Sequence, residues 1–233
     1  RVRQAIGARV NLVHRVDRGV SGALLCAKSD AGNATTVLQD AMASSSCSKT
    51  YLALVRGEGI LKGRDFRKEG WFKVNRPLND ESGNLKNATS YFRFIAGQDN
   101  DSGAIDRPRA SLVLARIETG RWHQIRKHLH GLSHPIIGDS SHGNSKTNRE
   151  WRKKWGLPAE RTCLHLLQLQ LPPTCVSPGG ISVNSSIPSD MMKMMEHLLP
   201  EVVEDARIAL EEEGLRMISG QDTEQVDIRM EIQ

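Results

Sequence analysis

Short apolar segments, separated by polar stretches rich in Gly, Asp and Asn, run through most of this 233-residue chain. None of them approaches the roughly 20 consecutive apolar residues that a membrane-spanning helix needs. Several are rich in β-branched and aromatic residues, as strands are, whereas others repeat apolar residues at helical spacing. The chain must therefore build its core from many short strands and a few helices, and its length suits one principal domain.

The order of these segments begins as strand, loop, strand, helix, strand. Helical spacing predicts a helix that Ser29 or Asp30 caps and that runs to about Met42, and another over residues 122–132. Beyond residue 188, a Met-rich amphipathic pattern predicts one or two helices whose Met stripe packs against a core. Strands are expected over residues 10–13, 23–27, 49–56, 88–94, 110–118 and 164–171.

Charge is distributed unevenly along the chain. Residues 190–233 hold 4 basic and 12 acidic side chains, whereas residues 1–189 hold 28 basic and 15 acidic ones. A body this basic suits a polyanionic partner, because Lys and Arg displace the counterions condensed on phosphates. We therefore expect a basic domain over 1–189 that binds nucleic acid, followed by a helical acidic extension over 190–233. A basic surface that only keeps the protein in solution is the alternative.

The cysteines and histidines give little sign of disulfides or metal. The four cysteines form no CxxC pair and lack the dense spacing of a secreted disulfide scaffold, which predicts a reduced, intracellular protein. The histidines of residues 123–142 lack zinc-ligand spacing and have no cysteine among them, so we expect no bound metal. The residues concerned are Cys26, Cys47, Cys163 and Cys175, and His123, His128, His130, His134 and His142.

Asp17 is the first candidate for chemistry. It lies between Arg15 and Arg18 in a loop bordered by Gly19 and Gly22. Nearby cations can hold a carboxylate ionised, and the glycines give the backbone freedom to present it to a ligand. Asp17 is therefore a candidate nucleophile. In the alternative interpretation, the carboxylate pairs with an arginine and does no more than pin the turn.

A second constellation spans residues 118–128. A strand ends there at a turn made by Gly120, which opens a basic helix. The first-turn amides and the cations of such a helix can address a phosphate or a carboxylate. Arg121 and Arg126 are five residues apart, so one can turn inward toward Asp17 while the other meets nucleic acid. A solvated basic helix is the alternative.

Cations and tryptophans are interleaved over residues 146–161. Aromatic and cationic side chains together can contact bases and phosphates. Trp151 and Trp155 also have the spacing of the buried side of a helix, which is the favoured interpretation for the tryptophans themselves. The cations of this stretch include Lys146, Arg149, Arg152, Lys153 and Lys154.

These segments, in this order, resemble the RluA-type family of RNA pseudouridine synthases over residues 12–173. Several spaced motifs in the right order are far more specific than any one of them. Residues 134–143 and 148–151 most resemble the branch that contains tRNA pseudouridine synthase C. The matching motifs are HRVDRGVSG at 14–22 for HRLDRxTSG, KTY at 49–51 for KxY, TGRWHQIR at 119–126 for TGRxHQIR, HPIIGD at 134–139 for PIxGD, and LH at 164–165 for an LHA-type strand start.

The resemblance implies an α+β fold, with a mixed, mainly antiparallel sheet, flanking helices and an active-site cleft. It implies an isomerase that converts a specific uridine of structured RNA to pseudouridine, with tRNA favoured over rRNA, no cofactor, no membrane and a monomeric chain. Asp17 corresponds to the catalytic aspartate and Arg126 to the arginine that pairs with it. Tyr51 corresponds to the residue that stacks on the target base, and Arg15 to one that holds the flipped-out arrangement.

The chain also departs from the family pattern. Only about a dozen residues precede the Asp17 motif, so we expect the chain to lack part of the family's sheet. The polar insertion near residue 100 and the Met-rich helices have no counterpart that we can assign. A catalytically silent RNA-binding protein on the same scaffold is the alternative function. A carboxylate-based glycoside hydrolase would need a second acidic residue beside Asp17, for which Glu118 and Asp139 are the candidates.

Overall fold

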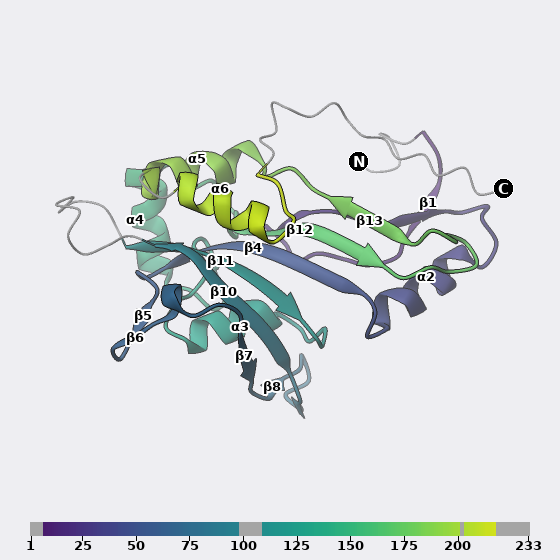
Figure 1. Ribbon diagram of the computed structural model, residues 1–233, viewed down its shortest axis with the longest axis horizontal. Coiled ribbons are helices and arrows are strands. Elements are labelled where there is room, and N and C mark those ends of the chain that lie inside the picture. Colours follow the sequence, from purple (N-terminus) through teal and green to yellow (C-terminus); the bar gives the residue numbers. More distant parts are fainter. Residues whose placement is uncertain (1–6, 98–108, 201–202, 218–233) are drawn as a thin grey trace.

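The computed structural model describes residues 7–97, 109–200 and 203–217, and one large sheet organises them (Figure 1). The polar insertion predicted near residue 100 lies outside these residues. The main path of the sheet runs β13, β12, β4, β11, β10, β7, with antiparallel neighbours throughout, and β2 pairs with β12 in parallel. Its strands are β2 (Ser21–Gly22), β4 (Ser48–Arg56), β7 (Phe72–Asn75), β10 (Thr89–Gly97), β11 (Ala110–Ile117), β12 (Leu164–Leu171) and β13 (Ile181–Asn184).

Side chains alternate between the two faces of this sheet. In β4, Leu52 and Leu54 lie opposite Leu114 and Leu112 of β11, and all four are fully buried on one face. Tyr51 falls one position out of phase with these leucines and therefore lies on the other face. Both faces carry buried apolar residues, since Ala53 and Val55, in phase with Tyr51, are also fully buried, and the cleft described below lies on the face of Tyr51.

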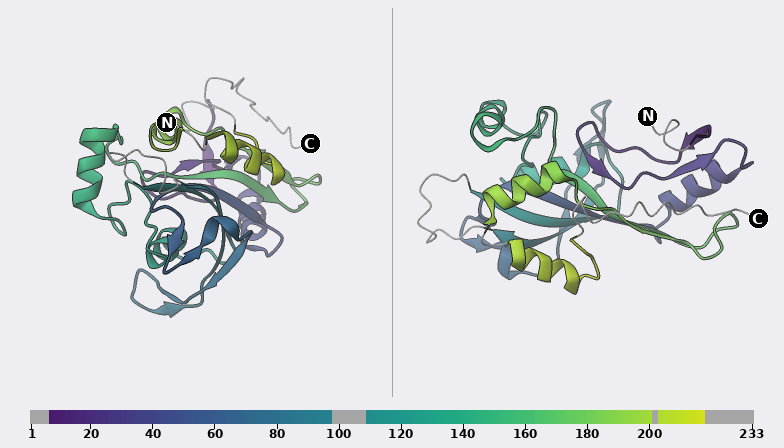
Figure 2. Two further views of the ribbon diagram at one scale, coloured as in Figure 1. Left: turned by 60° about the vertical axis from the view of Figure 1, so that its left-hand side comes forward. Right: turned by 90° about the horizontal axis from the view of Figure 1, so that it is seen from above.

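Five α-helices within the described residues surround the sheet (Figures 1 and 2). They are α2 (Ala34–Ala43), α3 (Gln124–Gly131), α4 (Ser145–Trp155), α5 (Ser189–Leu198) and α6 (Val203–Glu212). Helix α3 packs on the cleft face, where His128 meets Phe92 of β10 edge-on, with 6.5 Å between ring centroids. Arg93, next to Phe92 in β10, points to the opposite face of the sheet. It pairs there with Glu212 of α6, so α6 lies on that face. The expected α+β class, with a mainly antiparallel sheet and flanking helices, is confirmed.

The main core includes the C-terminal helices. Met191, Met194 and Met195 of α5 are buried in the same cluster as the leucines of the sheet, so the prediction that the Met stripe serves packing is confirmed. Trp151 of α4 is 4% exposed in that cluster, which confirms the buried-helix interpretation for this tryptophan. Trp155 is half-buried and meets His197 of α5 edge-on.

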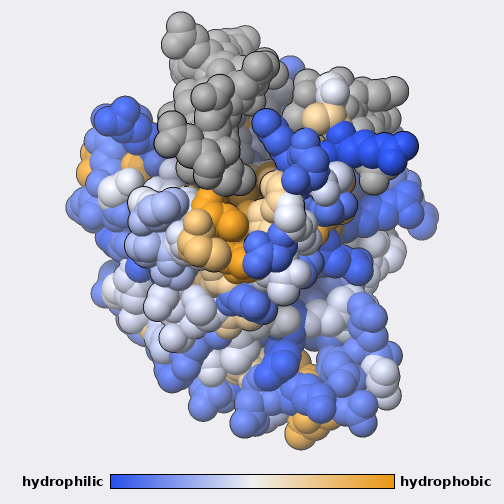
Figure 3. Space-filling model, turned by 90° about the vertical axis from the view of Figure 1, so that its right-hand side faces the viewer, coloured by the Kyte–Doolittle hydropathy of each residue, from blue (hydrophilic) through white to orange (hydrophobic). Residues whose placement is uncertain are grey.

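A smaller core lies at the end of the molecule opposite α4, where α2 packs near the strand pair β1 (Val10–Leu12) and β3 (Cys26–Lys28) (Figures 1 and 2). Leu38 and Met42 of α2 are buried there. The surface at this end is mostly hydrophilic around a small apolar area (Figure 3). Leu12 of β1 is 53% exposed.

Two helices begin later than the sequence pattern predicts. Helix α2 starts at Ala34, not after Ser29 or Asp30, because Gly32 adopts a left-handed φ of 54° that an uninterrupted helix does not allow. Helix α3 starts at Gln124 because His123, at φ 54°, is also left-handed. In both cases the apolar spacing is right, and the backbone conformation just before the helix sets its first residue.

Short elements complete the fold around the edge strands. The short elements are β5 (Ile60–Leu61), β6 (Arg64–Asp65), the 3₁₀ helix η1 (Phe66–Lys68), β8 (Leu78–Asn79) and β9 (Leu85–Lys86).

None of the helices that the structure describes combines the length and the apolar character needed to span a bilayer.

Candidate active site

A cleft of about 410 Å³ opens on the face of the sheet that carries α3. One wall is the loop between β1 and β2, and the other is the segment 120–126 that leads into α3. Tyr51 of β4 and Leu164 of β12 belong to the lining and come from the sheet itself. Of the four site residues predicted from the sequence, all lie on this lining: Arg15, Asp17, Tyr51 and Arg126.

The loop that carries Asp17 is fixed at its far end. Gly19 has a φ of 79°, and a Cβ there would lie 2.1 Å from the carbonyl oxygen of Glu160, so only glycine fits. The buried Arg161 donates from Nη1 to the Gly19 carbonyl at 3.0 Å and from Nη2 to Oγ of Ser21 at 2.8 Å. A guanidinium from a distant part of the chain therefore holds the turn that follows Asp17.

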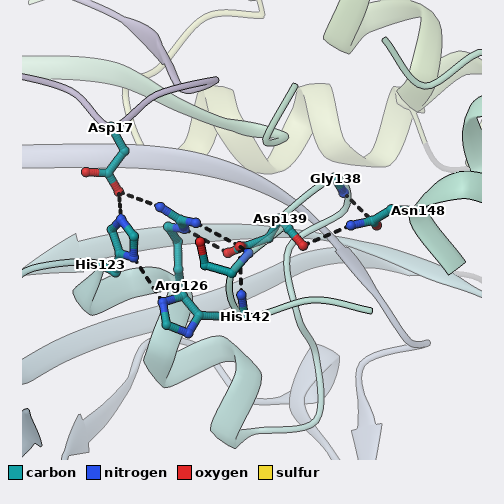
Figure 4. A network of polar contacts seen from close by, with 8 residues as sticks. Asp17, His123, Arg126, Gly138, Asp139, His142 and Asn148 are labelled. Carbon is teal, nitrogen blue, oxygen red and sulfur yellow. Dashed lines mark hydrogen bonds and ion pairs between the residues drawn. The ribbon is translucent and has the colours of Figure 1, made fainter. Parts of the chain in front are cut away.

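Asp17, Arg126 and Asp139 form a continuous network (Figure 4). Arg126 donates from Nη1 to Oδ2 of Asp17 at 3.1 Å, and from Nε and Nη2 to the two carboxylate oxygens of Asp139 at 2.7 Å each. Arg126 is 4% exposed and Asp139 fully buried, whereas the Asp17 side chain keeps 30% of its surface exposed. Thus Arg126, not Arg121, is the arginine that turns inward.

Asp139 is held by further hydrogen bonds besides those from Arg126. Its Oδ1 also accepts the backbone amides of Ser141 and His142, at 2.8 and 2.9 Å. Burial alone would raise the pKa of its carboxyl, but the hydrogen bonds from Arg126 and these amides bring that pKa below its ordinary value of 3.8. Asn148 of α4 donates to the Asp139 carbonyl at 2.8 Å and accepts from the Gly138 amide at 3.2 Å, which ties α4 to the site.

A pair of histidines approaches Asp17 from the other side. Nε2 of His123 lies 3.7 Å from Oδ2 of Asp17, and its Nδ1 lies 3.0 Å from Nε2 of His142. Arg126 and His123 thus meet the same oxygen of Asp17. Among the described residues, none donates a hydrogen bond to Oδ1, so this oxygen stays available to a molecule in the cleft.

Gln124 holds the segment that leads into α3. Its Oε1 accepts from Oγ1 of Thr119 at 2.7 Å and from the Arg121 amide at 3.0 Å, while its Nε2 donates to β10 at Thr89 and Ser90. The buried amide side chain therefore joins the turn to the sheet. These hydrogen bonds explain why Thr119 and Gln124 occur together in the TGRWHQ segment.

Tyr51 and Arg15 differ in how firmly they are held. The Tyr51 side chain packs against the core, and burial together with the charge of Asp17 raises the pKa of its hydroxyl. Arg15 is exposed at the cleft, and within the described ranges its side chain makes no hydrogen bond or ion pair. Arg18 points away and pairs with Glu160 at 2.7 Å, so neither flanking arginine pins Asp17.

Neither residue predicted as the second carboxylate of a glycoside hydrolase is available in the cleft. Asp139 is enclosed, and both its oxygens are held by Arg126, which stands between it and Asp17. Glu118 accepts from the Tyr91 hydroxyl at 3.0 Å and does not line the cleft. In the part of the chain that the structure describes, no group of three or more His, Cys, Asp or Glu side chains could hold a metal ion.

Sequence reasoning did not assign His142, Asn148 or Gln124 to the site. Gln124 and Asp139 belong to motifs that resemble those of the family, which was the signal available for them. The pairing of His142 with His123, 19 residues apart, had no signal in the sequence because it depends on how the chain returns after α3.

Sequence comparison finds that this chain is similar to proteins named as pseudouridine synthases. The model of the RNA pseudouridylate synthase family matches residues 1–131. Ribosomal large subunit pseudouridine synthase D of Zymomonas mobilis is 31% identical over 82% of this chain and 57% of the relative. tRNA pseudouridine synthase C of Yersinia pestis is 34% identical over 73% of this chain and 66% of the relative. The chain therefore spans less than two thirds of the length of these curated relatives.

Solved structures agree on the fold. Human RNA pseudouridylate synthase domain containing 1 superposes with a TM-score of 0.60 over 80% of this chain and 72% of that chain, at 22% identity. Human RNA pseudouridylate synthase domain containing 4 gives the same TM-score over 81% and 76%, at 19% identity. These two structures support the fold, and the family model that matches more than half of the residues shows that the chain belongs to the RNA pseudouridylate synthase family.

Proposed function

We propose that this protein isomerises a specific uridine of structured RNA to pseudouridine, with Asp17 as the catalytic residue and tRNA as the preferred substrate. The observation that carries the proposal is the state of Asp17 in the cleft. One of its oxygens is held by Arg126 and approached by His123, while the other is free to meet a ligand. Membership of the family supports an isomerase.

The proposed reaction rearranges bonds without a net gain or loss of atoms. The bond from C1′ of the ribose to the base nitrogen breaks, a bond from C1′ to a base carbon forms, and the proton of that carbon is exchanged for one on the nitrogen. This balance requires no oxidant, metal or cofactor. An ionised carboxylate can attack the sugar, attack the base or remove a sugar proton, and each route uses the free oxygen of Asp17.

The remaining predicted residues would act on the extruded nucleotide. A uridine must leave its stack before it can enter the cleft, at a cost of a few kcal/mol that contacts in the cleft must offset. Tyr51, which lines the cleft from β4, would stack on the base, and the exposed Arg15 would help to hold the flipped-out arrangement. Arg126 would keep Asp17 ionised and oriented.

The preference for tRNA follows from the likeness to tRNA pseudouridine synthase C in residues 134–151. Relatives of comparable similarity include one named for the large ribosomal subunit, so substrate choice requires a direct comparison.

The test is incubation of the protein with unmodified tRNA and ribosomal RNA transcripts in a chelator, followed by chemical mapping of pseudouridine. We expect product at a defined uridine of tRNA and none with Asp17→Asn, which should lower the rate by on the order of a thousandfold or more. Product only in ribosomal RNA would contradict the tRNA preference. If folded wild-type protein binds RNA but forms no product, the silent-binder alternative holds.

A further inference from the structure

His142 contacts the active site through another histidine. Its Nε2 lies 3.0 Å from Nδ1 of His123, and the two rings meet edge-on at 85° with 5.1 Å between centroids. His142 is held in place because its backbone amide donates to the buried Asp139 carboxylate. On its far side, His123 presents Nε2 toward Asp17 at 3.7 Å (Figure 4). The sequence His142, His123, Asp17 is therefore a chain of contacts that ends at the catalytic carboxylate.

His123 adopts its position at a cost to the backbone. Its φ of 54° is rare for a residue with a Cβ, and such conformations cost on the order of 1 kcal/mol or more. The ring stacks on Trp122 with 4.2 Å between centroids. The left-handed conformation and the stacking together aim the imidazole along the cleft toward Asp17 and His142.

Burial favours the neutral form of both imidazoles. Burial lowers the pKa of His142 to about 4 and also lowers the pKa of His123. The charged groups that face the pair are the carboxylates of Asp17 and Asp139 and the cations of Arg126 and Lys127, which act in opposite directions. Two neutral imidazoles joined by one hydrogen bond must have one donor and one acceptor.

The charge of Asp17 favours one of the two arrangements, and that arrangement needs a donor on His142. If Nδ1 of His123 carried the proton, its Nε2 lone pair would face the negative oxygen of Asp17, and the two would repel each other. If Nε2 carries the proton, the N–H points at Oδ2 of Asp17, and Nδ1 accepts from Nε2–H of His142. The second arrangement places a donor against every acceptor along the chain.

We propose that His142 is a positioning residue that fixes the tautomer of His123, so that His123 directs its Nε2–H at Oδ2 of Asp17. At 3.7 Å this contact is longer than a hydrogen bond, and active-site contacts of this kind commonly shorten when substrate binds. With Arg126 and His123 both on Oδ2, Oδ1 is the oxygen that meets the substrate. The inference about Oδ1 rests on the proposed function, whereas the tautomer of His123 does not.

Nitrogen-15 NMR of the full chain with labelled histidine tests the tautomer directly. The His123 signals, assigned by their loss in His123→Gln, should show a single form protonated at Nε2. In His142→Phe, which keeps an aromatic ring but has no donor, the signals should move toward a mixture of both tautomers. A wild-type His123 protonated at Nδ1, or no change in His142→Phe, would overturn the proposal. This result does not depend on whether the protein makes pseudouridine.

Single-turnover kinetics test the consequence for catalysis. We expect His142→Phe to lower the rate about tenfold while RNA affinity changes less than about twofold, as for other residues that orient a catalytic group. His142→Gln, which restores an N–H donor at similar reach, should stay within about threefold of wild type. A packing role predicts the opposite order, since Phe fills the space and Gln does not, and that order would overturn the proposal. Equal thermal midpoints would show that both variants are folded.

Discussion

Two clusters of arginine and carboxylate lie on opposite faces of the same sheet, and they end differently. On the cleft face, Asp139 accepts hydrogen bonds from Nε and Nη2 of Arg126. The remaining amino group, Nη1, donates to Asp17, whose side chain is 30% exposed. On the other face, Glu213, just after α6, accepts from Trp71, Arg93 and Arg116 at 2.7, 2.5 and 3.0 Å. We call the first an open network, because its last carboxylate is partly exposed in the cleft, and the second a closed cluster, because donors surround its carboxylate.

The closed cluster serves to hold elements together. Glu213 joins α6 to β10 and β11, and Arg116 lies over the Trp71 ring at 4.3 Å. The Glu213 side chain is 13% exposed and accepts hydrogen bonds from three residues. An acidic residue of the C-terminal segment therefore stabilises the fold, although its composition alone suggested a separate extension. The open cluster differs because its last carboxylate keeps a free oxygen that faces a cleft.

The largest effect should come from the buried end of the open network. Asp139→Asn removes the buried charge that Arg126 meets through two hydrogen bonds and leaves it only the partly exposed Asp17, and breaking a buried pair in this way costs about 3 to 5 kcal/mol. Because Arg126 also orients Asp17, single-turnover activity should fall with stability. Urea denaturation and RNA mapping check the two effects. An Asp139→Asn protein with wild-type activity would show that the network does not orient Asp17.

A smaller effect is expected from the closed cluster. Glu213→Gln should lower the free energy of unfolding by about 2 kcal/mol, since it weakens hydrogen bonds to a charged, mostly buried group. Activity should stay at the wild-type level when both proteins are assayed below their unfolding temperatures. A selective loss of activity in Glu213→Gln would break the distinction between the two faces.

The same contrast extends to the surface helices. On α6, Arg207 is paired with Glu204 and Glu211, whereas Lys146 and Lys153 on the outer side of α4 have no ion pair among the described residues. Unpaired cations of this kind are available to phosphates. We expect Lys146→Gln with Lys153→Gln to lower RNA affinity about tenfold and to reduce the salt slope by about two.

The matched control removes two exposed lysines elsewhere, with Lys62→Gln and Lys193→Gln. Fluorescence anisotropy over a series of salt concentrations compares the two double variants, and the single-turnover rate at saturating RNA should be unchanged in both. If the control weakens binding as much as the α4 variant, then α4 contributes only to the overall charge.

The smallest effect should appear in the pH dependence of stability. Burial raises the pKa of both carboxyls, but hydrogen bonds to arginine and other donors bring them below 3.8 for Asp139 and below 4.5 for Glu213. Stability from groups with lowered pKa is fully present above these ordinary values and is lost as the pH falls below them. Unfolding measurements from pH 6 downward should therefore show a flatter decline in Glu213→Gln than in wild type.

Local pattern was sufficient for much of this molecule. The strand predicted over 164–171 is β12 (Leu164–Leu171), and the Met stripe after residue 188 is core, because apolar spacing reports directly which side of an element is buried. The motif around Asp17 and the one ending at Arg126 were recognisable from the sequence. The first residues of α2 and α3 were not, since they depend on left-handed residues at positions 32 and 123.

The order of residues was sufficient to identify the apolar positions, the family resemblance, and Asp17 and Arg126 as candidates to meet. Three further contacts became visible only in the folded chain: Asp139 with Arg126, His142 with His123, and Glu213 with its donors on the opposite face. Hydrophobic spacing along the sequence reflects only which side of a helix or strand packs against the neighbouring layer of the fold. Pairing between residues far apart depends on strand register and on which face each side chain takes.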